Sequence, residues 1–159
     1  GHTFTGWFTA VTGGEKWIPA AVVPDHAVTY YARFTINSYD VVFADSGSTT
    51  NPVKYEYAAK VSAPAQPSKE GHTFNGWYTA ESGGTKWNFD TDTMPAKNLT
   101  LYAQYTVHQH EVIFKNGETM VQKETLNYGD LIQSPYGLEK EGYTFGGWST
   151  AESGGDRWH

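Results

Sequence analysis

The 159-residue chain contains no cysteine. This absence excludes disulfides, thiolate nucleophiles and cysteine-ligated zinc, so the fold must be stabilised by packing alone. It fits a cytosolic protein, or an extracellular protein of a cell that makes little use of disulfides. No apolar run approaches the ~20 residues that a membrane span needs. Acidic residues exceed basic ones by 17 to 11 without any basic cluster, which argues against a nucleic-acid partner.

Aromatic residues are abundant, at 16% of the chain, and many recur in one repeated phrase. The phrase reads GHTFTGWFTAVTGGEKW at residues 1–17, GHTFNGWYTAESGGTKW at 71–87 and GYTFGGWSTAESGGDRW at 142–158. Trp77 and Trp148 are 71 residues apart, and the same offset holds upstream of them without a gap. The sequence therefore predicts tandem copies of a unit of about 71 residues.

The offset divides the chain into three segments. Residues 1–35 form the C-terminal half of a copy (the first partial copy), residues 36–106 one complete copy (the middle copy), and residues 107–159 the N-terminal part of another (the last partial copy). Because the chain opens inside a repeat, we expect it to be a fragment of a longer protein. The connection at 107–109 has no Gly/Ser-rich linker, which predicts closely linked small domains.

Alternating apolar and polar residues predict strands at 39–45, 53–61, 73–80 and 99–106 of the middle copy. The first two are expected to pair antiparallel through a turn, and the prolines at 64 and 67 exclude a long helix from the segment after them. The predicted fold class is mainly β, or α+β with little helix. Because a small cysteine-free domain needs its rings inside, the predicted repeat core consists of Phe74, Trp77, Trp87, Leu101 and Tyr105.

Two histidines are candidate metal ligands. His108 and His110 would lie on one side of a strand, as two imidazole ligands of a metal can. The preceding copy has Asn37 and Tyr39 at the equivalent positions, and these residues could not form the same site. The pattern therefore favours ordinary surface histidines.

Two carboxylates are candidate calcium ligands. Asp90 and Asp92 flank a loop, but the loop has neither the length nor the ligand pattern of an EF-hand. The equivalent residues of the first partial copy, Ala20 and Val22, are apolar. A solvated turn is favoured, and we assign no metal and no cofactor.

The double glycine at 83–84 could suggest a phosphate-binding loop. It lacks the Gly-x-x-x-x-Gly-Lys-Ser/Thr pattern, so a hairpin turn is favoured. No Gly-x-Ser-x-Gly elbow is present, and no serine recurs with a plausible base. A carboxylate pair for glycoside hydrolysis stays open, but repeated copies without long irregular loops argue against an enzyme. We assign no catalytic residue.

Exposed aromatic residues or a free sheet edge would give an interaction surface. Tyr78, Tyr102 and Tyr105 could stack on a sugar, although the core interpretation is favoured for them. The strand at 99–106 could lie at an edge that accepts another chain by β-augmentation.

Three stretches of the middle copy resemble a known family. They are EGHTFNGWYT at 70–79, GGTKWNFD at 83–90 and MPAKNLTLYAQY at 94–105. Their order and spacing are similar to the Listeria–Bacteroides repeat, the B repeat of internalin-type surface proteins. The first partial copy departs from the pattern, since Trp17-Ile18-Pro19 replaces the Trp-Asn-Phe-Asp word, which leaves loop detail open.

The resemblance implies a β-grasp-like (ubiquitin-like) domain, related in shape to mucin-binding modules. It implies an extracellular location on the cell surface or wall of a Gram-positive bacterium, in an adhesin- or invasin-like parent. It implies no enzymatic activity and no cofactor. The expected function is that of a spacer and weak interaction module, with a host surface protein, a glycan or a wall polymer as partner; a carbohydrate- or mucin-binding module is the alternative.

The partial copies suggest a further partner. The last partial copy lacks the strand equivalent to 99–106, and the first partial copy carries a spare one at 28–35. We expect the spare strand to be able to complete the sheet near 111–114, within one chain or between molecules, as in domain swapping.

Overall fold

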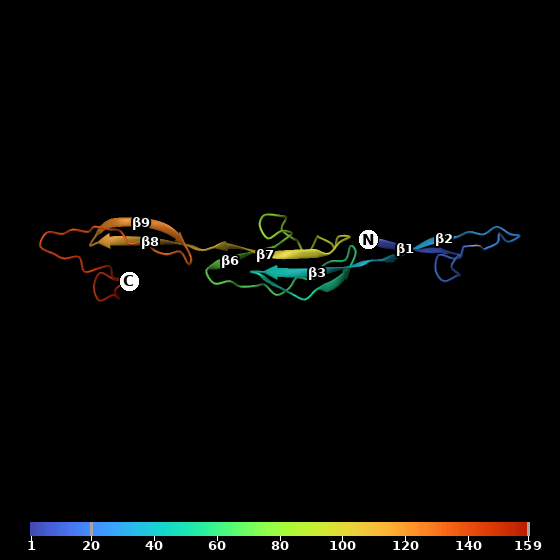
Figure 1. Cartoon of the computed structure of the whole chain (residues 1–159), viewed down its shortest axis with the longest axis horizontal. Coiled ribbons are helices and arrows are strands. Elements are labelled where there is room, and N and C mark those ends of the chain that lie inside the picture. The colour runs from blue at the N-terminus through green and yellow to red at the C-terminus, as the bar shows by residue number, and fades with distance from the viewer. Residues whose placement is uncertain (20, 159) are drawn as a thin grey trace. The chain divides into compact units, whose positions relative to one another are not determined.

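The computed structural model describes residues 1–19 and 21–158, and within them it shows strands and loops but no helix (Figure 1). The mainly-β class predicted from the sequence is confirmed. The strands are β1 (His2–Phe8), β2 (Tyr31–Ile36), β3 (Ser38–Asp45), β4 (Ser48–Thr49), β5 (Val53–Glu56), β6 (His72–Tyr78), β7 (Leu99–Val107), β8 (Gln109–Asn116) and β9 (Thr119–Asn127). One compact unit combines Gly1–Ser68 with Phe74–Tyr105, and the other combines Lys69–Thr73 with the residues from Thr106 onward.

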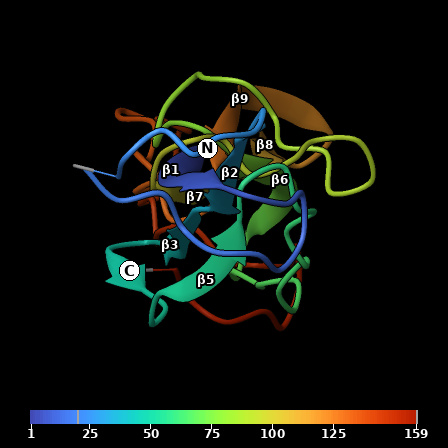
Figure 2. The ribbon, with the colours of Figure 1, turned by 90° about the vertical axis from the view of Figure 1, so that its right-hand side faces the viewer.

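The middle copy is built on a sheet with the order β4-β3-β7-β6. The strand β5 also pairs with β3, beside which it is seen in Figure 2. The antiparallel pairing of β3 with β5 was predicted, whereas the parallel pairing of β3 with β7 was not. In that parallel pair Val41 lies opposite Leu99 and Phe43 opposite Leu101. Because side chains alternate along a strand, this register puts all four apolar residues on one face.

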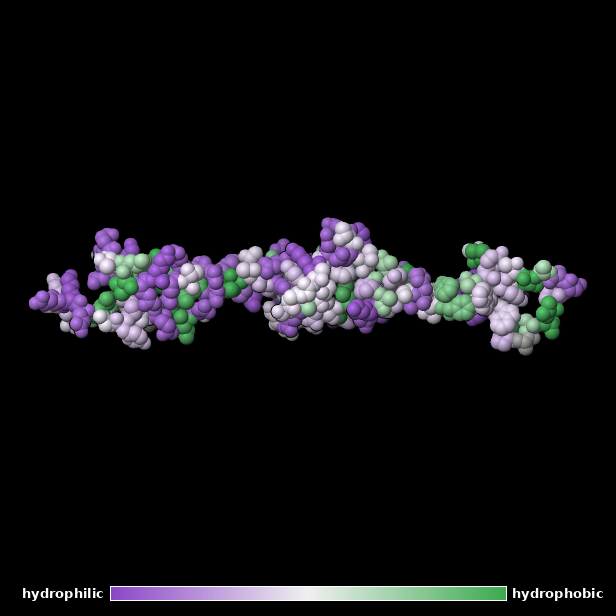
Figure 3. Space-filling model, turned by 90° about the horizontal axis from the view of Figure 1, so that it is seen from above, coloured by the Kyte–Doolittle hydropathy of each residue, from purple (hydrophilic) through white to green (hydrophobic). Residues whose placement is uncertain are grey.

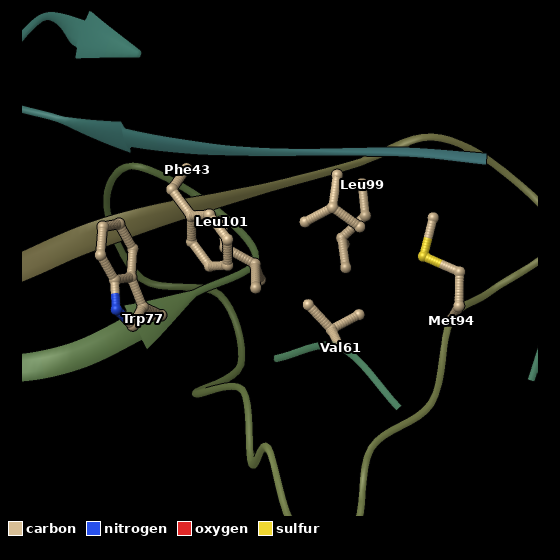
Figure 4. Packing of buried hydrophobic residues seen from close by; sticks show 7 residues of the cluster. Phe43, Val61, Trp77, Met94, Leu99 and Leu101 are labelled. Carbon is tan, nitrogen blue, oxygen red and sulfur yellow. The ribbon is translucent and has the colours of Figure 1, made fainter. Parts of the chain in front are cut away.

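The core of the middle copy lies on that face (Figure 4). Its buried residues are Val41, Phe43, Val61, Trp77, Met94, Leu99 and Leu101. Phe43 meets Trp77 edge to face, with ring centroids 4.9 Å apart. Among the residues expected in the core, Phe74 and Trp87 pack against this cluster, and the ring of Tyr105 lies 5.5 Å from that of Phe74.

The strand predicted at 53–61 is shorter than expected, because β5 ends at Glu56. The chain turns at Ala58, which adopts a left-handed backbone with φ of 63°. Residues beyond this turn leave the sheet, yet Val61 is buried in the core. After the double glycine at 83–84, the chain pairs with β6 through a single bridge, between Lys86 and Tyr78.

The first partial copy is an antiparallel pair, β1 with β2, that carries a bulge between Phe4 and Gly6. Gly6 has a φ of 134°, which L side chains rarely adopt, so the bulge needs glycine here. The rings of Phe4, Trp7 and Phe34 are exposed on this pair. Phe4 and Trp7 are the equivalents of Phe74 and Trp77. This hairpin therefore exposes the aromatic face whose equivalent is packed into the core of the middle copy.

The last partial copy is also an antiparallel pair, β8 with β9. Phe114 is buried between Trp148 and Trp158, with ring centroids at 4.8 and 5.8 Å. In the part of the chain that the structure describes, β2 pairs with β1 and β8 pairs with β9.

Candidate functional site

The candidate metal ligands serve local structure. Among the described residues, no group of three or more His, Cys, Asp or Glu side chains could hold a metal ion. His108 Nε2 lies 2.9 Å from the Thr73 hydroxyl, and its ring centroid is 6.5 Å from that of His110. The Asp92 carboxylate accepts a 2.8 Å hydrogen bond from the backbone N–H of Asn88. This bond closes the loop that was considered as a calcium site.

The double glycine forms the hairpin turn that the sequence predicted. Gly83 and Gly84 both have positive φ, at 68° and 71°. The Thr85 amide donates to the Thr79 hydroxyl, and the Thr79 amide donates to the Thr85 carbonyl, both at 3.0 Å. The turn is therefore closed by a reciprocal threonine contact.

Sequence reasoning missed the side chain that fastens this loop. Gln104 Nε2 donates to the Ala80 carbonyl at 2.9 Å and to the Gly83 carbonyl at 2.8 Å. Arg33 has the equivalent position in the first partial copy, and its Nη2 donates to the carbonyls of Ala10 and Gly13. The only available signal was that a long side chain with N–H donors stands at the same repeat position in both copies.

The aromatic residues considered for sugar stacking do not form an exposed platform. Tyr78 and Tyr102 are half-buried, and Tyr105 packs on Phe74. Burial, a hydrogen bond with Asp45 and the charge of that carboxylate raise the pKa of Tyr105 to about 12. The Tyr105 hydroxyl is thus held within the fold.

Open aromatic surface occurs instead on the two partial copies. A hollow of about 350 Å³ in the first partial copy is lined by Trp7, Trp17 and Tyr30. Figure 3 shows hydrophobic residues at the surface of this part of the chain, on the right-hand side. A cleft of about 620 Å³ in the last partial copy is lined by five aromatic side chains among others: Phe114, Tyr143, Phe145, Trp148 and Trp158.

Consecutive copies are joined through a single residue. Asn37 stands between β2 and β3. Its backbone N–H donates to the Gly1 carbonyl, and its backbone carbonyl accepts from the Tyr57 N–H, both at 2.8 Å. The Thr3 hydroxyl donates to the Asn37 side-chain oxygen at 2.7 Å. We call this arrangement the first junction.

The second junction repeats the first with histidine in place of asparagine. His108 stands between β7 and β8; its amide donates to the Gly71 carbonyl, and its carbonyl accepts from the Tyr128 amide, both at 2.7 Å. Thr73 contacts the His108 ring, as Thr3 contacts Asn37. The connection between copies is therefore hydrogen-bonded on both sides.

Comparison with known proteins agrees with the repeat pattern. The Listeria-Bacteroides repeat domain matches residues 1–33, 39–104 and 110–159. The gaps between the matched ranges enclose Asn37 and His108, so the boundaries of the family domain coincide with the two junctions. No helix in the described part of the chain has the length and apolar character to cross a membrane.

Among similar proteins, Internalin H of Listeria monocytogenes is 51% identical over 107 residues, covering 67% of this chain and 19% of its own length. Two proteins of Evansella cellulosilytica are also similar. One, named a Gly-rich membrane protein, is 36% identical and covers 93% of the chain. The other, named a membrane protein, is 33% identical and covers 97%.

The chain spans between 17% and 24% of the length of these relatives. The relatives suggest a bacterial protein that is associated with the surface or the membrane. Because the family domain matches all three segments, the chain belongs to the Listeria-Bacteroides repeat family.

Proposed function

We propose that this chain is a non-catalytic spacer in an extracellular, wall-associated adhesin- or invasin-like protein of a Gram-positive bacterium. Its β-grasp-like copies would extend and present a neighbouring ligand-binding domain. The observation that carries the proposal is the junction: a single residue leads from β7 to β8, and it is hydrogen-bonded to Gly71 and Tyr128. A repeat that avoids flexible linkers is suited to setting a distance. The resemblance to Internalin H supports a surface protein as the parent.

Small-angle X-ray scattering tests the spacer role. One or two additional copies of residues 37–107 are inserted after Val107, so that each added boundary reproduces a natural junction. We expect the maximum dimension to rise by the same increment for each added copy. The control is the chain with a Gly/Ser segment of equal length in place of the added copy, because such a segment behaves as a random coil. An increment no larger than that of the Gly/Ser segment would contradict the proposal.

A second part of the proposed function is weak binding to a host surface protein, a glycan or a wall polymer. Several weak sites on one array gain affinity through avidity. We expect binding to purified cell walls to increase more steeply than linearly with the number of copies, in a pull-down with chains of one to three middle copies. Binding that is absent at every copy number would count against this part and would leave the spacer role intact.

Carbohydrate or mucin binding is the alternative function, and the aromatic cleft of the last partial copy is the feature that favours it. Aromatic faces such as those of Trp148 and Tyr143 offer apolar stacking surfaces. A glycan array probed with the chain and with a Trp148→Ala variant tests this alternative. A signal that is lost in the variant would favour sugar recognition.

We propose a strand of a second molecule as the occupant of the same cleft. In the middle copy, Leu99–Tyr102 pairs in parallel with Val41–Ala44, and the equivalent residues are 28–31 and 112–115. The strand β2 begins only at Tyr31, so residues 28–30 are outside any strand, and Val28 and Tyr30 are exposed. Pairing of Val28 with Val112 in a neighbouring molecule would bury them.

Light scattering over a concentration series tests this strand exchange. We expect the molar mass of the chain to rise with concentration and a Val28→Asp variant to stay monomeric. The matched control is Val23→Asp, since Val23 is exposed and lies outside the strand. A constant monomer mass for the unmodified chain, or equal effects of the two variants, would refute the exchange.

A further inference from the structure

The ring of Tyr128 occupies the place where a side chain on Gly71 would lie. A Cβ built on Gly71 would be 2.0 Å from Cδ1 and 2.1 Å from Cγ of Tyr128, well inside van der Waals contact. Gly71 belongs to the middle copy and Tyr128 to the next one. Any residue other than glycine at this position would push the tyrosine of the following copy out of its place.

The first junction has the same arrangement. A Cβ built on Gly1 would be 2.1 Å from Cγ of Tyr57, although Gly1 and Tyr57 belong to different copies. Gly142 is the third glycine of this series, and nothing lies within 4 Å of its Cβ position. No side chain of its own copy therefore occupies the space beside this glycine. At Gly1 and Gly71 the tyrosine of the following copy occupies that space.

Other contacts hold the tyrosine in this position. The ring of His72 meets that of Tyr128 edge to face at 6.5 Å, and the ring of His2 meets that of Tyr57 in the same way at 5.8 Å. The backbone of the junction residue, His108, is hydrogen-bonded to both residues: its N–H donates to the Gly71 carbonyl, and its carbonyl accepts from the Tyr128 N–H. In keeping with this packing, Lys69–Thr73 belong to the same compact unit as the residues that follow Thr106.

We propose that the Gly71–Tyr128 and Gly1–Tyr57 contacts are interlocks that couple the folding of consecutive copies. The turn at the glycine of one copy is stable when the next copy supplies its tyrosine, and the junction opens when the ring is removed. Stability in such an array has a nearest-neighbour term in addition to the stability of each copy. The inference stands independently of the spacer role, because it concerns the folding of the chain and not its function on the cell.

Amide hydrogen exchange measured by NMR on the full chain tests the interlock. Gly71→Ala and Gly142→Ala form a matched pair, because both glycines have a left-handed φ, at 68° and 77°, and only Gly71 has a tyrosine over it. The reporters are the amides of His108 and Tyr128. We expect exchange at these amides to be about tenfold faster, or more, in Gly71→Ala than in Gly142→Ala, a factor that corresponds to about 1.4 kcal/mol.

A double-mutant comparison separates the interlock from backbone strain. In a Tyr128→Ala background the space over Gly71 is open. Gly71→Ala should then accelerate amide exchange no more than Gly142→Ala does. If Gly71→Ala accelerates exchange equally with and without the tyrosine, the interlock is refuted.

The first junction gives an independent test in which no glycine is changed. Tyr57→Ala should accelerate exchange of the Asn37 amide about tenfold, whereas Tyr57→Phe, which keeps the ring, should stay within about threefold of the unmodified chain. Protection of the Phe43 amide, which donates to the Thr50 hydroxyl, reports separately that the middle copy is folded. Unchanged exchange at Asn37 in Tyr57→Ala would overturn the proposal.

Discussion

The side chain of Gln104 fastens the loop that contains Gly83, with 2.8 Å between Nε2 and the carbonyl oxygen. A second hydrogen bond from the same amide reaches Ala80. Gln104→Ala should therefore destabilise the middle copy by about 1–3 kcal/mol, since each hydrogen bond contributes roughly 0.5–1.5 kcal/mol. Chemical denaturation followed by circular dichroism measures the change.

Gln104→Arg is the conservative variant for this contact. Arg33 donates to the equivalent two carbonyls in the first partial copy, so arginine should retain most of the stability. Gln66→Ala, at an exposed position, serves as the control. Equal losses in the alanine and arginine variants would show that the loop is not held in this way.

The paired tryptophans Trp77 and Trp7 offer a test of the core. Trp77 is 7% exposed and Trp7 is 45% exposed, although they occupy the same repeat position. Trp77→Ala should cost about 3–5 kcal/mol of unfolding free energy, as expected for a buried tryptophan. Trp7→Ala should cost less than half of that, because less surface is buried. Denaturation midpoints of the two variants decide the matter, and similar losses would contradict the assigned core.

Tyr105 makes stability depend on alkaline pH. Burial, together with the hydrogen bond and the charge of Asp45, raises its pKa from 10.0 to about 12. The folded state thus holds the phenolic proton more tightly than the unfolded state does. This contribution is complete below pH 10 and is lost as the pH rises through about 12.

The Tyr105→Phe variant isolates that contribution. Phenylalanine is compatible with the position, because Phe34 occupies it in the first partial copy. We expect the fall in the denaturation midpoint between pH 10 and about 12 to be steeper in the unmodified chain than in the variant. Parallel curves would mean that Tyr105 titrates normally.

Ala58 adopts a left-handed backbone with φ of 63°, and Gly129 takes its place in the last partial copy with φ of 88°. Ala58→Gly should stabilise the middle copy by up to about 1 kcal/mol, because glycine adopts this conformation without a steric penalty. Ala59→Gly, next to it, should instead destabilise by about 0.5–1 kcal/mol, since it only adds backbone freedom to the unfolded chain. Thermal unfolding of both variants measures the difference in sign.

Much of the local structure could be predicted from the sequence. Alternation at 39–45 predicted the strand, in which Val41 and Phe43 share one face; that this face is the buried one comes from the structure. The parallel pairing of β3 with β7 could not be predicted in this way, because alternation gives the face of a strand and not its neighbour. The left-handed turn at Ala58 was also missed, since alanine does not mark a positive φ as glycine does.

The junctions were predicted only as short connections. Their main contact joins Gly71 to Tyr128, two residues in different copies whose proximity depends on the folded hairpin β8–β9. Read singly, Gly71 is a turn residue and Tyr128 is one more aromatic. The signal that could have found the contact is the recurrence of both at a fixed spacing, as Gly1 with Tyr57 and as Gly71 with Tyr128.

Each complete copy carries both halves of a junction. The middle copy offers Tyr57 to the glycine before it and Gly71 to the tyrosine after it. Duplication or deletion of one whole copy in the gene therefore rebuilds a matching boundary without any compensating mutation. Gain or loss of a whole copy can therefore lengthen or shorten the array while every new boundary keeps its glycine and its tyrosine.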